Sequence, residues 1–135
     1  MAVSQSLRGQ AVVIDKYVTL AATSGTTTGI SVPAGTLVIA AGFEATGAVA
    51  DVTTYTMDIT DGTTVFANDL NFDAAAAGTI KVGTTAGLIT SADTVDVVTT
   101  ISGSPGTVAG RVFIVCVDVN ESVRPAAVAD RDILA

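Results

Sequence analysis

One stretch of the chain decides the fold: Tyr55-Thr56-Met57-Asp58-Ile59-Thr60, followed by Asp61-Gly62. Apolar and polar residues alternate in it with a period of two. This spacing places Tyr55, Met57 and Ile59 on the buried face of a β-strand and the polar residues on the other face. Asp-Gly is a frequent hairpin dipeptide. The stretch therefore predicts a half-buried strand that turns back into an antiparallel neighbour.

The same signals recur along the whole chain. Thr- and Val-rich segments alternate with glycines about every ten residues, which is the rhythm of sandwiches and barrels. Turn chemistry is evident in Pro33-Ala34-Gly35 and in residues 102–106. In the segment 93–101, Val95, Val97 and Ile101 are expected to face inward, and Thr94, Asp96 and Thr100 outward. The predicted strands are 11–21, 29–32, 36–43, 54–60, 64–66, 79–82, 93–101 and 110–119.

The length of 135 residues fits one domain. We expect an all-β fold, a single antiparallel β-sandwich over residues 11–120. Residues 1–10 lack a pattern and are expected to form an N-terminal arm. Residues 121–135 are expected to form a C-terminal arm, because Pro125 cannot donate a hydrogen bond to a sheet.

Two predicted strands are apolar on both faces, the segments 37–41 and 112–117. In an antiparallel sheet one face meets the core, so the second apolar face must meet something else. A chain of this length has little material for a further layer of its own. We therefore expect a subunit contact that includes Val38, Phe113 and Val115.

The composition also indicates burial beyond that of a lone domain. Hydrophobic residues make up 49% and charged residues 14% of the chain, against about 25% charged in ordinary globular domains. No run of about 18 apolar residues occurs, so no transmembrane segment is predicted, and the start of the chain lacks the pattern of a signal peptide. We expect a homo-oligomer or symmetric array, or a protein partner that covers the excess apolar surface. A membrane is not an expected partner.

Charge is distributed unevenly between the body and the ends. The net charge is −7, which argues against a nucleic-acid partner. Half of the six cations lie in the arms, as Arg8, Arg124 and Arg131. Ile133 and Leu134 add an apolar tip that gains stability only by docking. We predict that these five residues contact neighbouring subunits, although solubilising arginines and a disordered tail are the alternatives.

The residues needed for catalysis and metal binding are missing or poorly placed. The chain has no histidine, which removes the usual general base, the Ser-His-Asp triad and most transition-metal sites. Its one cysteine, Cys116, lies in an apolar run and is expected to be a buried structural thiol. We predict no enzyme activity, no catalytic residue and no cofactor.

Acidic residues offer two weaker candidate sites. Asp58 with Asp61, and Asp93 with Asp96, are carboxylate pairs without any sign of the cleft that hydrolysis requires. The run 69–73 begins like a calcium loop, but Ala74 and Ile80 stand where the loop needs Gly and a bidentate Glu. We expect a turn with Asx hydrogen bonds there, and no metal site.

A resemblance to a known class of proteins rests on several stretches in order. These are residues 32–38, 55–62, 66–70 with the alanine run that follows, 91–97 and 110–113. The chain resembles the small Ala-, Gly-, Thr- and Val-rich virion structural proteins of tailed bacteriophages, over residues 11–119. The resemblance implies a jelly-roll-like sandwich that decorates or cements a capsid, or forms a knob or tail part. It also implies a location in the virion and contact with the major capsid protein or another virion protein.

An alternative function is host recognition by a glycan-binding knob or tail module on the virion surface. That function predicts exposed residues, such as Phe66, Phe72 and Asn71, around a groove. The aromatic fraction of 4% argues against it.

Overall fold

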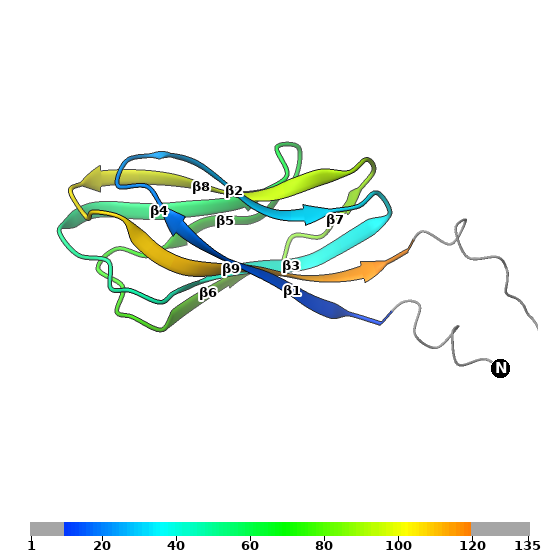
Figure 1. The fold of residues 1–135 in the computed structure, drawn as a ribbon, viewed down its shortest axis with the longest axis horizontal. Coiled ribbons are helices and arrows are strands. Elements are labelled where there is room, and N and C mark those ends of the chain that lie inside the picture. The colour runs from blue at the N-terminus through cyan, green and yellow to red at the C-terminus, as the bar shows by residue number, and fades with distance from the viewer. Residues whose placement is uncertain (1–9, 120–135) are drawn as a thin grey trace, which may run out of the picture.

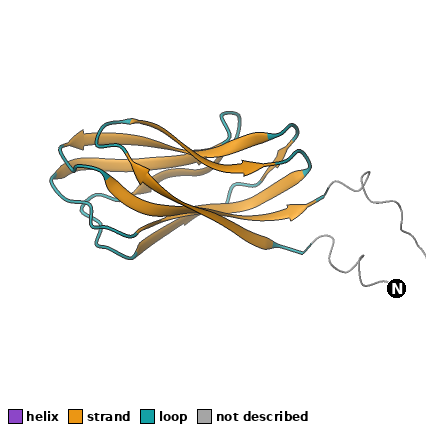
Figure 2. Ribbon diagram, viewed as in Figure 1, coloured by secondary structure: helices purple, strands orange, loops and turns teal. Residues whose placement is uncertain are grey.

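A computed structural model of the chain describes residues 10–119, which form two antiparallel sheets packed face to face (Figure 1). These residues form strands, turns and loops without a helix (Figure 2). Within them, accordingly, no helix is long and apolar enough to cross a membrane. The strands are β1 (Val12–Leu20), β2 (Gly25–Val32), β3 (Thr36–Ala45), β4 (Val52–Thr60), β5 (Val65–Asn71), β6 (Thr79–Gly83), β7 (Gly87–Ile89), β8 (Asp93–Gly103) and β9 (Val108–Asp118).

The strand order confirms the all-β sandwich and its jelly-roll character. Sheet A has the order β1-β9-β3-β6, and β7 also pairs with β3. Sheet B has the order β2-β8-β4-β5. Strands β6 and β7 pair with successive parts of β3, so they act as one interrupted strand. Counted in that way, the connections between the two sheets are those of an eight-stranded jelly roll.

The core lies between the two sheets, as the alternating pattern predicts. Tyr55, Met57 and Ile59 on β4 are buried, and so are Val95 and Val97 on β8. On β8 the third predicted inward residue, Ile101, packs against the core but is only partly buried. The rings of Phe43 and Phe72 meet edge to face at 5.7 Å, joining β3 to the end of β5.

Several strand boundaries differ from the sequence-based expectation. Strand β7 was not predicted, and β2 begins at Gly25 instead of Gly29. Strand β5 runs on to Asn71, beyond the predicted segment 64–66. Its alternation is obscured because the pairing with β4 shifts register, so that the consecutive residues Phe66 and Ala67 are both buried.

Both ends of the described chain lie at one end of the sandwich. The start of β1 pairs with the end of β9, with Val12 opposite Cys116. The turn between β2 and β3 lies beside them, because the Val119 N–H donates to the Gly35 carbonyl at 2.9 Å. Residues 1–9 and 120–135 therefore join the domain at the same place (Figure 1).

Candidate interaction surface

The outer face of sheet A is the most apolar surface of the described chain. Strands β3 and β9, which the sequence predicts to be apolar on both faces, are neighbours in this sheet. Residues directly opposite in an antiparallel pair share a face, so the register shows which side chains point outward. The outward apolar residues are Val13, Tyr17, Leu37, Ile80, Val82, Leu88, Phe113, Val115 and Val117. We call this set the apolar face.

The structure corrects one predicted contact residue. Phe113 and Val115 are half-buried and belong to the apolar face, so their contact role stays a prediction. Val38, by contrast, is 0% exposed and points into the core. Strand β3 carries apolar residues on both faces, as predicted. Because successive side chains of a strand point to opposite faces, Thr36 and Val38 point inward and Leu37 between them points outward.

Other members of the apolar face were not predicted. Tyr17 is 72% exposed and Val13 63% exposed, both on β1, while Ile80 and Val82 lie half-exposed on β6. In sequence these residues look like ordinary core positions of short strands. The one sequence feature that sets them apart is the apolar run Val12-Val13-Ile14, which breaks the alternation at the start of the predicted strand 11–21.

The outer face of sheet B is different in kind. Thr94, Asp96 and Thr100 point outward as predicted, and residues of β4 such as Thr56 and Asp58 stand opposite β8 on the same face. Val65, 37% exposed on the edge strand β5, is the one large exposed apolar residue of this sheet within residues 10–119. Sheet B therefore presents hydroxyls and carboxylates where sheet A presents aliphatic and aromatic side chains.

The two sheets also differ in charge. The strands of sheet A carry Asp15, Glu44 and Asp118 against Lys16, Lys81 and Arg111, so their net charge is zero. All other charged residues of the described chain are carboxylates, on the strands of sheet B or in loops. They are Asp51, Asp58, Asp61, Asp69, Asp73, Asp93 and Asp96, which together give −7. On the outer face of sheet A the register places Asp15, Glu44 and Arg111, a net charge of −1 with all three groups joined in ion pairs, whereas the outer face of sheet B carries Asp58 and Asp96 and its strands hold no cation. Covering sheet A therefore buries less unpaired charge than covering sheet B.

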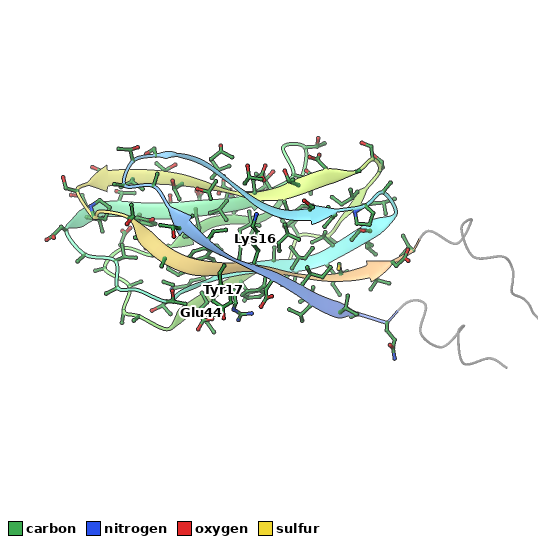
Figure 3. The ribbon with its side chains drawn as sticks, viewed as in Figure 1. Lys16, Tyr17 and Glu44 are labelled. Atoms are coloured by element: carbon green, nitrogen blue, oxygen red, sulfur yellow. The ribbon has the colours of Figure 1, made fainter. Side chains whose placement is uncertain are left out.

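An ion-pair network crosses the apolar face. Arg111 on β9 donates from Nη1 to Asp15 Oδ2 at 2.8 Å and from Nε to Glu44 Oε1 at 3.1 Å, and so connects β1, β9 and β3. Its guanidinium also lies 5.2 Å from the ring centre of Phe113. These hydrogen bonds, to Asp15 first and then to Glu44, raise the pKa of Arg111 above its ordinary value. Figure 3 shows Glu44 and Tyr17 on the outer side of sheet A, with Lys16 directed toward sheet B.

An apolar groove opens at the end of the sandwich where the two undescribed segments attach. It has a volume of about 350 Å³ and is lined by Val12, Ile14, Pro33, Ala34, Thr36, Cys116 and Asp118. Cys116 is 3% exposed, and this burial raises the pKa of its thiol. The predicted buried structural cysteine is confirmed. A second, shallower hollow of about 220 Å³ lies beside Tyr17 on the same sheet.

The carboxylates considered above as candidate catalytic or metal sites accept hydrogen bonds from backbone N–H groups. Asp58 Oδ1 accepts from the Asp69 N–H at 2.7 Å, and Asp61 Oδ1 accepts from the Thr64 N–H at 2.7 Å in the β4–β5 turn. Asn71 Oδ1 accepts from the Asp73 N–H at 2.8 Å, an Asx hydrogen bond of the predicted type. Within residues 10–119, no three His, Cys, Asp or Glu side chains gather where they could hold a metal ion.

Two of the three residues that the glycan-binding alternative expects at the surface are buried. Phe66 and Phe72 are each 0% exposed, because both rings fill the space between the sheets. They cannot stack on a sugar without unfolding the core. Only Asn71 of that set is exposed.

The predicted arm contacts lie outside the described residues. They are Arg8, Arg124, Arg131, Ile133 and Leu134.

The described residues thus form a small jelly-roll domain with one apolar outer face. Comparison with solved structures finds the same fold in two phage capsids. A chain of the cyanophage Pam1 capsid asymmetric unit superposes with a TM-score of 0.62 and 19% identity, over 82% of this chain and 86% of that one. A chain of the acid-stable capsid of Helicobacter pylori bacteriophage KHP30 gives 0.53 and 18%, over 80% and 91%. At the level of the fold, the expected resemblance is confirmed.

No protein family matches the chain, and no curated protein sequence matches it significantly.

Proposed function

We propose that this protein is a structural subunit of a phage virion, a capsid decoration or cement protein that docks on the shell through the apolar face. The observation that carries the proposal is the division of the domain into an apolar sheet A, whose strands sum to zero charge, and a Thr- and Asp-rich sheet B, whose strands sum to −4. A subunit that lies on a shell needs one surface to cover and one to remain in water. The fold shared with chains of two phage capsids supports this role. The role requires no catalysis and no cofactor.

The energetics of docking favour a repeated weak contact. Fully burying an Ile, Leu or Val side chain contributes about 1.5–3 kcal/mol. Ile80, Val82 and Leu88 are 52%, 50% and 48% exposed, so covering each of them contributes about 1 kcal/mol. Association costs cancel much of this gain for one subunit, but many copies on one shell would bind by avidity. The major capsid protein, which forms such a repeated surface, is the partner that this arrangement suits.

The arms are proposed as additional contacts. Both attach beside the apolar groove, whose lining would accept side chains such as Ile133 and Leu134 from a neighbouring subunit. Arg124 and Arg131 would meet an acidic neighbour. Deleting residues 121–135 should lower the occupancy of the protein on the particle and the particle's resistance to heat. If neither changes, the arm contacts are refuted.

The docking face is tested with a charge placed on either side of the domain. Ile80→Lys puts a cation on the apolar face, and Val65→Lys puts the same charge on sheet B, at a residue that is also exposed. Particles from phage carrying each variant are purified, and the bound protein is quantified by mass spectrometry. We expect Ile80→Lys to be lost from particles and Val65→Lys to be retained, with both proteins folded by circular dichroism. Equal retention, or selective loss of Val65→Lys, would refute docking through sheet A.

A further inference from the structure

We infer that the free edge of β1 is a second contact surface, which pairs in antiparallel fashion with β1 of another copy of this chain. The pairing would continue sheet A across a two-fold axis and leave both apolar faces on the same side. The inference rests on the geometry and charge of β1, so it stands or falls separately from the proposed function.

The four sheet edges are not alike. Unpaired edges invite association, and proteins normally interrupt them with bulges, short strands or charges. In sheet B, β2 is broken by a register shift between Thr27 and Ile30, and β5 by two shifts against β4. The far edge of sheet A is split into the short strands β6 and β7, of five and three residues. Strand β1 has nine residues without Gly, Pro or any register shift.

No described strand covers this edge. Strand β9 is the hydrogen-bonded neighbour of β1 in sheet A, and β1 ends the strand order. The exposed apolar residues concentrate on it: Val12 and Ile14 on the side that faces the groove, and Val13 and Tyr17 on the apolar face. A long, regular and apolar edge of this kind is stable in water when another strand completes it.

The charged side chains of β1 do not protect its free edge from association with another strand. A charged side chain usually protects an edge by staying free in solvent. Asp15 is bound to Arg111 of β9 at 2.8 Å, and the Lys16 ammonium donates to the Gly29 carbonyl of β2 at 3.2 Å. Both charged groups are therefore held within their own domain, and because they are opposite in sign, β1 itself carries no net charge.

Charge excludes two registers of this pairing, and the aromatic residue of β1 favours one of those that remain. A two-fold axis at Asp15 or at Lys16 would place like charges directly opposite each other, which is destabilising. An axis at Tyr17 avoids this and pairs residues 14–20 of both strands. Asp15 then faces Thr19, Lys16 faces Val18 and Ile14 faces Leu20, while the two Tyr17 rings meet at the axis. Aromatic pairs across strands are favourable.

The solution mass of the full chain tests the pairing, measured by sedimentation velocity over a concentration series. We expect a monomer–dimer equilibrium. Tyr17→Lys places two ammonium groups at the axis and should raise the dimer dissociation constant about tenfold or more, a loss of about 1.4 kcal/mol. Val65→Lys adds the same charge on sheet B and should leave the dimer unchanged. A wild-type chain that stays monomeric, or equal effects of the two variants, would overturn the inference.

A disulfide reports on the register. Opposite residues in an antiparallel pair have Cα atoms about 4.5–5.5 Å apart, within the range that a disulfide spans. Tyr17→Cys should therefore oxidise to a covalent dimer much faster than Thr100→Cys, an exposed position on sheet B. The native Cys116 is buried and adds no background. A dimer whose Tyr17→Cys variant crosslinks no faster than Thr100→Cys would show that another surface, or another register, holds the two copies together.

Discussion

Removing one buried hydroxyl should make this protein more stable. Tyr55 on β4 is 0% exposed, and its phenolic oxygen has no hydrogen-bond partner among the described residues. A buried polar group left without its hydrogen bond costs about 1–3 kcal/mol. Tyr55→Phe removes that cost and leaves a void the size of one oxygen atom, worth about 0.3 kcal/mol at about 24 cal/mol per Å³. We expect a net gain of about 1 kcal/mol in the free energy of unfolding.

The pH dependence of stability provides a second measure of the same hydroxyl. Burial raises the pKa of Tyr55 above its ordinary value of 10.0. The unfolded chain therefore loses this proton at a lower pH than the folded chain does. The ionisation of Tyr55 therefore leaves the free energy of unfolding unchanged below about pH 10 and lowers it as the pH rises above that value. At alkaline pH, Tyr55→Phe should therefore lose less of its free energy of unfolding than the wild-type protein. The loss due to Cys116, whose pKa is raised from 9.0, remains in both proteins.

Urea unfolding followed by far-ultraviolet circular dichroism measures both effects, at pH 7 and in steps above pH 9. A gain of 1 kcal/mol corresponds to a rise in Tm of about 4 °C for a domain of this size. Tyr17→Phe is the matched control, because Tyr17 is 72% exposed and its hydroxyl is hydrated. The reasoning is refuted if Tyr55→Phe loses about 1 kcal/mol or more, since the phenol must then hold a hydrogen bond, for example to a buried water.

Further predictions concern packing, charge and the thiol. Gly110→Ala should lower the free energy of unfolding by about 1–3 kcal/mol, because the added Cβ would lie 2.2 Å from the Phe43 ring. The control Gly25→Ala, whose added Cβ would have nothing within 4 Å, should be nearly neutral in the same urea titration. Arg111→Met should destabilise the domain more at low than at high ionic strength, since two carboxylates lose their shared cation; an effect independent of salt would contradict the network. Cys116 should react with a thiol reagent in urea but hardly at all in the native protein; rapid native labelling would show that the groove exposes it.

The class of fold and the inward faces of the most regular strands could be predicted from the amino-acid sequence. Alternation with a period of two marks β4 and β8 and assigns their inward residues, because the pleat of a strand sends successive side chains to opposite faces. Asp61-Gly62 marks the hairpin between β4 and β5, where the chain does turn. The absence of histidine and the low charge followed directly from composition.

Tertiary structure alone decided how these strands come together. The two strands with apolar residues on both faces form one surface because β3 and β9 are neighbours in sheet A. Their paired residues Glu44 and Arg111 lie 67 positions apart in the sequence. Asp15 and Arg111, which join β1 to that surface, lie 96 positions apart. The same pairing turned Val38 inward, exposed Tyr17 and left sheet A neutral beside an acidic sheet B. A periodic pattern is a local property of a strand and carries no record of which distant strand will be its neighbour. The surface that we propose as the contact therefore exists only once the sheets have formed.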